Sequence, residues 1–400
     1  MPQHTEHLRP ALTRKGAATT LEFAAFNRVF RLALTSNQRL AQLAAGSSVQ
    51  LYKGTLEGAP GSWARISIQD GLPRGLIWDG RELFIVDAAP DAVNYGAAGT
   101  VMFKLSDAVL EQGVAFTGDT VETPRDAAVD YKAMIGELRA TTQALGATEG
   151  VKISVLGDTA YLARDPNEAE ARDASLTRLN NVDGIFSAQV GVELQVESVN
   201  IAGDLTAGLS ATTDSSALLE ELGRLRQQTS ALSTTGLTHL FTGRELDGNT
   251  AGVAYTTALC SQRFGASLTM AHNSAALDAL ITAHEIGHVF GAPHDGTEQC
   301  ASTPQGQFIM TPTLSSSITS FSQCSLDQIN AVLDSYSCVV ALPSPTPVPV
   351  PPAPPAPSPG GDGGGGGGGG SLDLSLLLLL FALGAARLRH RVNSRTDQSA

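Results

Sequence analysis

Residues 284–295 combine histidine, glutamate and glycine at the spacing of a catalytic zinc site. Residues four apart lie on the same face of a helix, so His284 and His288 can direct imidazole nitrogens at one ion. Gly291 can take the left-handed conformation that ends a helix and turns the chain aside, which would bring His294 back as a third ligand. Glu285 stands beside these ligands as a candidate general base.

Three protein ligands leave one position of a tetrahedral zinc ion open for water, which is the arrangement of a catalytic site rather than a structural one. The alternative is an amphipathic helix whose histidines only face solvent. Five fixed residue types at these spacings are rare by chance in a chain with 8 histidines. We therefore expect Zn²⁺ as the cofactor and hydrolysis as the chemistry.

The string from His284 to His294 resembles the metzincin zinc peptidases, and the following Asp295 resembles their adamalysin (reprolysin) branch, which contains ADAM proteases and snake-venom metalloproteases. Metzincins carry a methionine in a tight turn below the metal. Residues 307–312 are similar to that turn and make Met310 the candidate, although a lone methionine can also fill a gap in a core. The resemblance implies an α/β (α+β) fold with a mixed twisted sheet and a long zinc-binding helix.

The resemblance also implies a substrate-binding edge strand at Gly252, Val253, Ala254 and Tyr255. A peptide added as a further strand binds through main-chain hydrogen bonds with loose sequence preference. The expected partners are therefore protein or peptide substrates. The other interpretation of these four residues is an ordinary buried strand.

All four cysteines lie at or after residue 260. In an exported protein this even number indicates two disulfides, for which three connectivities exist. The chain has no Cys-x-x-Cys spacing, which disfavours a second zinc site. The family resemblance implies the pairs Cys260–Cys338 and Cys300–Cys324, each stabilising the fold by about 3 to 4.5 kcal/mol in the chain-entropy model.

The zinc helix must be positioned by a layer of strands and helices within residues 151–340. Ser274 is the expected N-cap of this helix, and its buried side is expected at Leu280, Ala283, Ile286 and Phe290. Strand and helix patterns alternate before it, which is typical of an α/β layer and of the adamalysin catalytic domain. The predicted strands are 151–156, 192–196 and 238–241, and the predicted helices are 168–189, 217–227 and a closing helix at 326–335.

Residues 21–145 are predicted to form a small β-rich domain, because apolar and polar residues alternate between glycine-rich turns up to about residue 88. The residues from Phe30 to Leu40 and a pattern from Tyr52 to Gly75 resemble the adamalysin pro-domain. This resemblance implies a zymogen whose pro-domain covers the active site and is cleaved away between about residues 120 and 150. Many such pro-domains inhibit the enzyme through a cysteine that ligates the zinc, but no cysteine precedes Cys260 here. Latency must then come from another ligand or from occlusion of the cleft. The alternative is a structural β-domain that stays attached.

The two ends of the chain bear on localisation. Residues 1–20 are polar and show no secretory signal peptide, so either the start lies upstream or export uses another route. A Pro- and Gly-rich linker (341–370), an apolar run (371–388) and a basic tail (389–400) resemble the GlyGly-CTERM sorting tail of Gram-negative bacteria, which a rhombosortase-type protease removes. A plain membrane anchor is the alternative, with the basic residues cytoplasmic. The catalytic domain is expected outside the cytoplasm in both cases.

The sequence therefore predicts a bacterial exported zinc endopeptidase, at the cell surface or secreted after removal of its tail. The formal net charge of −13 disfavours nucleic acid as a partner. Two other classes remain: a surface-anchored adhesion or binding protein with a structural zinc site, which the intact Glu285 disfavours, and a zinc hydrolase acting on a non-peptide bond. The sequence gives no indication of calcium sites, cleavage specificity or the number of subunits.

Overall fold

The computed structural model describes residues 4–16, 18–89, 99–108, 119–121, 147–313 and 318–343 of the 400-residue chain, with the backbone alone at 119–121. Within these ranges, no helix is long and apolar enough to cross a membrane. The predicted sorting helix and basic tail lie outside the described residues, as does most of the predicted cleavage region.

The described residues between 4 and 108 form a nine-stranded antiparallel sheet, which we call the β module. Its strand order is β1-β9-β8-β7-β6-β5-β4-β3-β2, and β1 also contacts β3, so the sheet curls around its own core. The sheet begins before residue 21, because β1 and β2 lie in the stretch expected to be only polar. The strands are β1 (Glu6–Leu8), β2 (Ala11–Lys15), β3 (Ala18–Ala25), β4 (Arg28–Ser36), β5 (Gln50–Leu56), β6 (Trp63–Gln69), β7 (Leu72–Trp78), β8 (Leu83–Ala88) and β9 (Thr100–Lys104), with helix α1 (Gln38–Leu43) between β4 and β5.

A second sheet of seven strands forms the framework of the remaining described residues. Its order is β10-β14-β15-β13-β11-β12, and β16 pairs with β11 in addition. Strands β15, β13, β11 and β12 are mutually parallel, whereas β14 runs antiparallel to β15. The strands are β10 (Asp119–Val121), β11 (Glu149–Gly157), β12 (Val192–Ile201), β13 (Leu237–Thr242), β14 (Gly252–Tyr255), β15 (Ala266–Met270) and β16 (Val339–Ala341).

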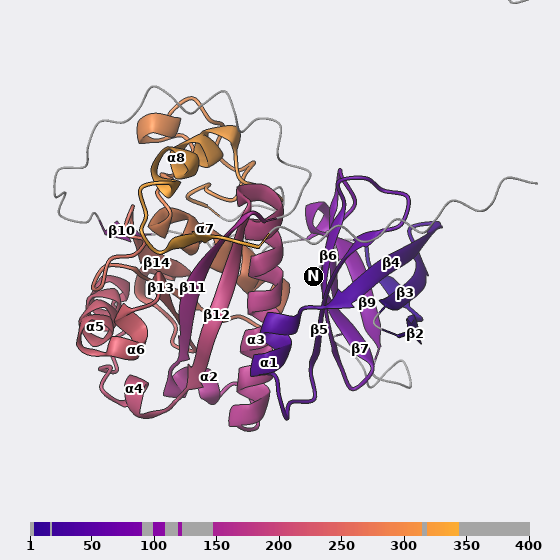
Figure 1. Cartoon of the computed structure of the whole chain (residues 1–400), viewed down its shortest axis with the longest axis horizontal. Helices are drawn as coiled ribbons and strands as arrows, with labels where there is room; N and C mark the ends of the chain where they lie inside the picture. The colour runs from indigo at the N-terminus through magenta and orange to yellow at the C-terminus, as the bar shows by residue number, and fades with distance from the viewer. Residues whose placement is uncertain are drawn as a thin grey trace, which may run out of the picture. The chain divides into compact units, whose positions relative to one another are not determined.

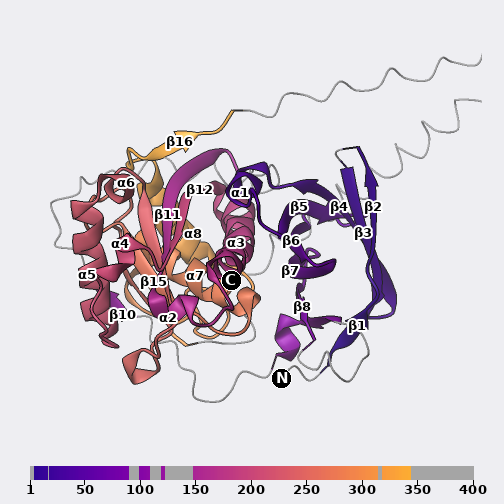
Figure 2. The ribbon, with the colours of Figure 1, turned by 90° about the horizontal axis from the view of Figure 1, so that it is seen from below.

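Helices cover both faces of this second sheet. Helices α3 (Glu168–Ile185) and α7 (Ala275–Val289) lie on one face, and α5 (Ser215–Gln228) and α6 (Ser230–Ser233) on the other (Figures 1 and 2). The remaining helices are α2 (Thr159–Leu162), α4 (Asp204–Ala207) and α8 (Gln323–Leu333). The arrangement is the mixed α/β type that the sequence predicts.

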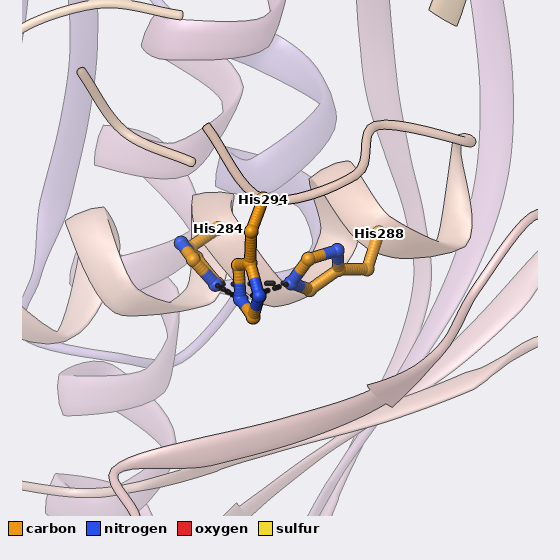
Figure 3. A group of neighbouring side chains, drawn as sticks. All are labelled: His284, His288 and His294. Atoms are coloured by element: carbon orange, nitrogen blue, oxygen red, sulfur yellow. Dashed lines mark hydrogen bonds between the residues drawn. The ribbon is translucent and has the colours of Figure 1, made fainter. Parts of the chain in front are cut away.

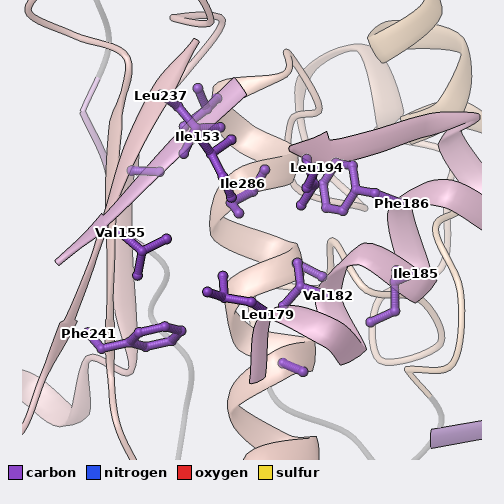
Figure 4. Packing of buried hydrophobic residues seen from close by; sticks show 14 of the residues in the cluster. Ile153, Val155, Leu179, Val182, Ile185, Phe186, Leu194, Leu237, Phe241 and Ile286 are labelled. Carbon is purple, nitrogen blue, oxygen red and sulfur yellow. The ribbon is translucent and has the colours of Figure 1, made fainter. Parts of the chain in front are cut away.

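The apolar core between the sheet and helices α3 and α7 holds the candidate zinc helix in place. Ile153 and Val155 of β11 face Leu179 and Val182 of α3, and Ile286 of α7 packs in the same cluster (Figure 4). All five side chains are fully buried. Close packing of this kind lets a helix present side chains in one fixed direction.

Most predicted elements lie where the sequence patterns indicate. The predicted strands and helices between residues 151 and 241 fall on β11, α3, β12, α5 and β13. The predicted helix 168–189 changes to a π turn at Phe186–Val190, and the closing helix starts at Gln323 rather than 326 because Ser322 caps it. Strand β15 has no counterpart among the predictions.

Candidate metal centre and peptide-binding edge

Helix α7 carries two candidate ligands and ends at a sharp turn. It begins after Ser274, whose hydroxyl accepts a hydrogen bond from the amide of Leu277 (3.4 Å), so the predicted N-cap is confirmed. It ends before Gly291, whose φ of +109° is in the region that favours glycine. The amide of Gly291 bonds the carbonyl of His288 (2.9 Å), and the chain then reverses towards the helix.

The three predicted ligands converge on one point (Figure 3). The Nε2 atoms of His284, His288 and His294 are 3.0 to 3.2 Å apart, pair by pair. A tetrahedral zinc ion with zinc–nitrogen bonds of about 2.0–2.1 Å would separate its ligands by about 3.3–3.4 Å. Three imidazole nitrogens at nearly this spacing fit zinc both in geometry and in donor type.

Backbone carbonyls hold the first two rings in the orientation that a metal requires. Nδ1 of His284 lies 2.7 Å from the carbonyl of Ile309, and Nδ1 of His288 lies 2.8 Å from that of Ala292. A proton on Nδ1 leaves the lone pair of Nε2 for the ion. Burial lowers the pKa of His284 to about 3 and that of His288 well below its usual range, so both are neutral at neutral pH.

Glu285 is fully buried beside the ligands and lies against the start of β14. A Cβ atom at Gly252 would be only 2.6 Å from Oε1 of Glu285 and 2.7 Å from its Cγ. Real Cβ atoms do not approach so closely, so only glycine fits at this position while the carboxylate keeps its place. The resemblance assigns Gly252 to the edge strand, but no sequence signal indicates its contact with Glu285.

Met310 lies under the zinc helix, in line with the predicted methionine turn. It is fully buried, and a Cβ atom at Gly287 would be 2.7 Å from its sulfur. The amide of Asp295 donates to the carbonyl of Met310 (2.8 Å), which ties the turn to the residue after the third histidine. The glycine in the middle of the metal motif therefore provides the space that the methionine occupies.

Asp295 links the metal-binding turn to helix α8. Its Oδ1 accepts hydrogen bonds from the hydroxyls of Ser322 (2.7 Å) and Ser325 (3.3 Å), all within a buried region. Burial raises the pKa of Asp295 despite these two donors. No role for Ser322 or Ser325 is predicted from the sequence; the aspartate directly after the third histidine is the sequence signal for such donors.

The cysteines form Cys260–Cys338 and Cys300–Cys324, the pairing that the family resemblance implies. Cys300–Cys324 joins the loop after His294 to the first turn of α8. Cys260–Cys338 joins the segment after β14 to the residue before β16. The described part of the chain contains no free cysteine.

Strand β14, which the resemblance predicts as the substrate-binding edge strand, lies one strand inside the sheet. It pairs with β15 on one side, and on its other side the short strand β10 pairs with it in parallel, with Thr120 opposite Ala254. All four residues of β14 are buried. Both backbone edges of the strand are therefore taken up by the chain itself.

Three imidazoles aimed at one point, a carboxylate on the same helix and the antiparallel strand β14 beside them define a metal-dependent hydrolase centre on an α/β framework. Comparison with known proteins specifies the class further. Residues 147–322 match the reprolysin-type model (Reprolysin_5) of metallopeptidase family M12. This stretch is a reprolysin-like domain, and its enzyme class is zinc metalloendopeptidase.

Several curated proteins are similar to the chain. The metalloproteinase-disintegrin-like brevilysin H2a of Gloydius brevicauda is 34% identical over 110 residues, 26% of this chain and 26% of that protein. Snake venom metalloproteinase TM-1 of Protobothrops mucrosquamatus is 33% identical over 108 residues, which cover 26% of this chain and 52% of that protein. The human protein "A disintegrin and metalloproteinase with thrombospondin motifs 14" is 24% identical over 392 residues, which cover 86% of this chain and 32% of that protein. The chain thus spans about a quarter to a half of these relatives' lengths.

Proposed function

We propose that this protein is an exported zinc endopeptidase that hydrolyses proteins or peptides. The observation that carries the proposal is the convergence of the Nε2 atoms of His284, His288 and His294 within 3.2 Å of one another, on and just after the helix that contains Glu285. The likeness of residues 147–322 to M12 peptidases supports the same chemistry.

The side chains divide the work between binding and proton transfer. The three imidazoles would hold zinc through Nε2 while the carbonyls at Nδ1 keep two of the rings oriented. The chemistry that zinc supplies when bound is acidification of a water molecule and polarisation of the scissile carbonyl. Glu285 takes the proton of the attacking water and passes it to the leaving amine. Its burial excludes bulk water, which strengthens these electrostatic interactions.

We further propose that substrate backbone pairs with β14 and that β10 makes the uncut chain latent. A substrate strand and β10 compete for the same backbone edge, so β10 must leave before a peptide can pair there. This supports latency by occlusion, in a chain that has no cysteine before Cys260. Cleavage of the segment that contains β10 would then activate the enzyme.

Substitution Glu285→Gln tests the proposed activity. The full chain is assayed on casein before and after being cut at two introduced protease sites, one in residues 109–118 and one in residues 122–146, which together release the segment that contains β10. The variant should keep its zinc and its fold and lose casein hydrolysis by at least about 100-fold. A chelator should abolish wild-type activity and added zinc should restore it. A wild type that binds zinc without cutting casein would favour the binding-protein alternative, and an active variant would show that the base lies elsewhere.

The two disulfides support export, because such bonds persist in oxidising compartments. We propose that residues 371–388 serve as a bacterial membrane-sorting segment and that a rhombosortase-type protease removes it. Mass spectrometry of the protein from culture medium and from membranes tests this. A secreted form that keeps residues 371–400 would contradict removal of the tail.

A further inference from the structure

Strands β5 to β8 of the β module bury large apolar side chains on both faces. Successive side chains in a strand point to opposite faces. One set lies in the module's own core: Tyr52, Ala64, Ile66, Ile77, Phe84 and Val86. The intervening set lies in the core shared with the peptidase domain: Leu51, Trp63, Leu76, Leu83 and Ile85. The module therefore shares a hydrophobic core with its neighbour rather than resting on its surface.

The same boundary contains a buried ion pair. Nε and Nη2 of Arg65 on β6 lie 3.2 and 3.0 Å from Oδ2 of Asp183 on α3, and both side chains are less than a tenth exposed. The other oxygen, Oδ1, accepts hydrogen bonds from the hydroxyl of Ser187 (3.0 Å) and the amide of Leu194 (3.3 Å). Loss of the guanidinium while the boundary stays closed would leave this carboxylate buried without its cation, which is strongly unfavourable.

Buried amides bridge the boundary a second time. Nδ2 of Asn37, in the module, donates to Oδ1 of Asn180 on α3 (3.0 Å), and Nδ2 of Asn180 donates to the carbonyl of Tyr52 on β5 (3.2 Å). Helix α3 is correspondingly buried on all sides from Ser175 to its end. Polar residues on every side of a helix are stable in a core only where partners satisfy them.

Helix α3 also lacks a side chain where the module packs most closely. A Cβ atom at Gly184 would lie 2.5 Å from Cγ of Arg65 and 2.9 Å from the ring of Trp63. Glycine in a helix interior is otherwise unfavourable relative to alanine. The shape of α3 at this position therefore matches the β module.

We propose that the β module is a permanent part of the enzyme, which stays bound to α3 after the chain between residues 108 and 147 is cut. Helix α3 in turn contacts the zinc helix through the ion pair between Arg178 and Asp278 (2.7 Å). The module thus completes the core that supports the metal site, while latency resides in the segment that contains β10. The association itself does not depend on the proposed peptidase activity.

The test uses the full chain carrying Glu285→Gln, which prevents self-digestion, with a sequence-specific protease site introduced into residues 109–118, so that β10 stays on the peptidase fragment. After complete cutting, both fragments should co-elute in size-exclusion chromatography at micromolar concentration and separate only in denaturant. Fragments that separate in native buffer would overturn the proposal.

Two variants show whether the contacts on α3 are responsible. Arg65→Met should weaken the association of the fragments by about 100-fold or more, and Gly184→Ala should lower the urea concentration at which they separate, although alanine favours an isolated helix. Arg31→Met is the matched control, because Arg31 pairs with Glu22 on an exposed face of the module. Equal dissociation of all three variants and the parent would contradict the proposed interface, even if the fragments co-elute.

Discussion

Gly252 lies directly against the carboxylate of Glu285, and this contact makes a prediction about catalysis. An added Cβ would approach Oε1 to 2.6 Å, so Gly252→Ala must displace the carboxylate. A displacement of this size in a reacting group lowers kcat/KM by about 100-fold. Zinc content should stay normal, because the three ligands lie on other segments. Measurement of kcat/KM together with bound zinc separates the two effects.

The matched control for this substitution is Gly208→Ala. No heavy atom lies within 4 Å of a Cβ placed at Gly208, so this variant should retain wild-type activity. Full activity in Gly252→Ala would mean that the edge strand does not fix the carboxylate.

His239 makes a prediction about acid stability that is independent of the metal. It lies fully buried on β13, with Nδ1 2.8 Å from the hydroxyl of Ser267, and burial lowers its pKa to about 3. Between pH of about 6.5 and 3 the unfolded chain therefore binds a proton that the folded chain does not, and the free energy of unfolding falls as pH falls. His239→Leu should reduce this slope by about 1.4 kcal/mol per pH unit.

Urea unfolding of metal-free protein at several pH values in this window measures the two slopes. The comparison uses slopes rather than absolute stabilities, because the substitution also changes packing and removes the contact with Ser267. Identical slopes in wild type and variant would show that His239 titrates normally in the folded chain.

At the scale of elements, the parts of the fold that the sequence predicts are those with a local physical signal. Ser274 marks the start of α7, because an N-cap hydroxyl satisfies a free amide within the helix's first turn. Strand β15 has no such signal, since four of its five residues are buried and the apolar alternation of a half-buried strand is missing. Strand β2 is exposed at every position, and pairing with β3 alone places it in the sheet.

Strand β10 makes a prediction about latency. A proline at Thr120 removes an amide and disfavours pairing within a strand, so Thr120→Pro should release the edge of β14. The uncut variant should cleave a peptide substrate faster than the uncut wild type, whereas both should be equally active after cuts on both sides of β10. Initial rates on a fluorogenic peptide measure this.

A proline placed outside β10 serves as the control. Thr123→Pro should leave the uncut chain as latent as the wild type, because residue 123 lies beyond the strand. Equal activity of uncut Thr120→Pro and uncut wild type would show that pairing of β10 with β14 is not what limits access.

Ser322 connects two elements, and its loss should affect both. Its hydroxyl accepts a hydrogen bond from the amide of Ser325 (3.1 Å) as the N-cap of α8 and donates to Asp295 (2.7 Å). Ser322→Ala leaves a buried carboxylate with one donor fewer, which lowers the free energy of unfolding by about 1–3 kcal/mol. Zinc affinity should fall as well, since Asp295 follows the third ligand. Unchanged unfolding and zinc titrations would contradict this link.

At the scale of the whole molecule, the sequence predicts a β-rich region but not what lies on its second face. The alternation in β6 predicts one buried and one exposed face, yet Trp63, Arg65 and Ser67 on the second face are buried as well. The helix that covers them follows about a hundred residues later, and nothing local to β6 encodes that partner. The same limit applies to Asp183 and Asn180. Their polar side chains are predicted to face solvent, because their partners Arg65 and Asn37 lie far away in the sequence, in the β module.

The two disulfides should contribute differently to the whole peptidase domain. Cys260–Cys338 closes a loop of 78 residues and Cys300–Cys324 one of 24. In the chain-entropy model their removal lowers the free energy of unfolding by about 4.5 and 3.5 kcal/mol respectively. Zinc affinity should instead be reduced more by Cys300→Ala/Cys324→Ala, by about tenfold, because the Cys300–Cys324 bond holds the loop after His294. Urea unfolding and zinc titration of the two double variants measure both quantities. If loss of Cys260–Cys338 lowers both stability and zinc affinity more than loss of Cys300–Cys324 does, the loop after His294 keeps its position without its disulfide.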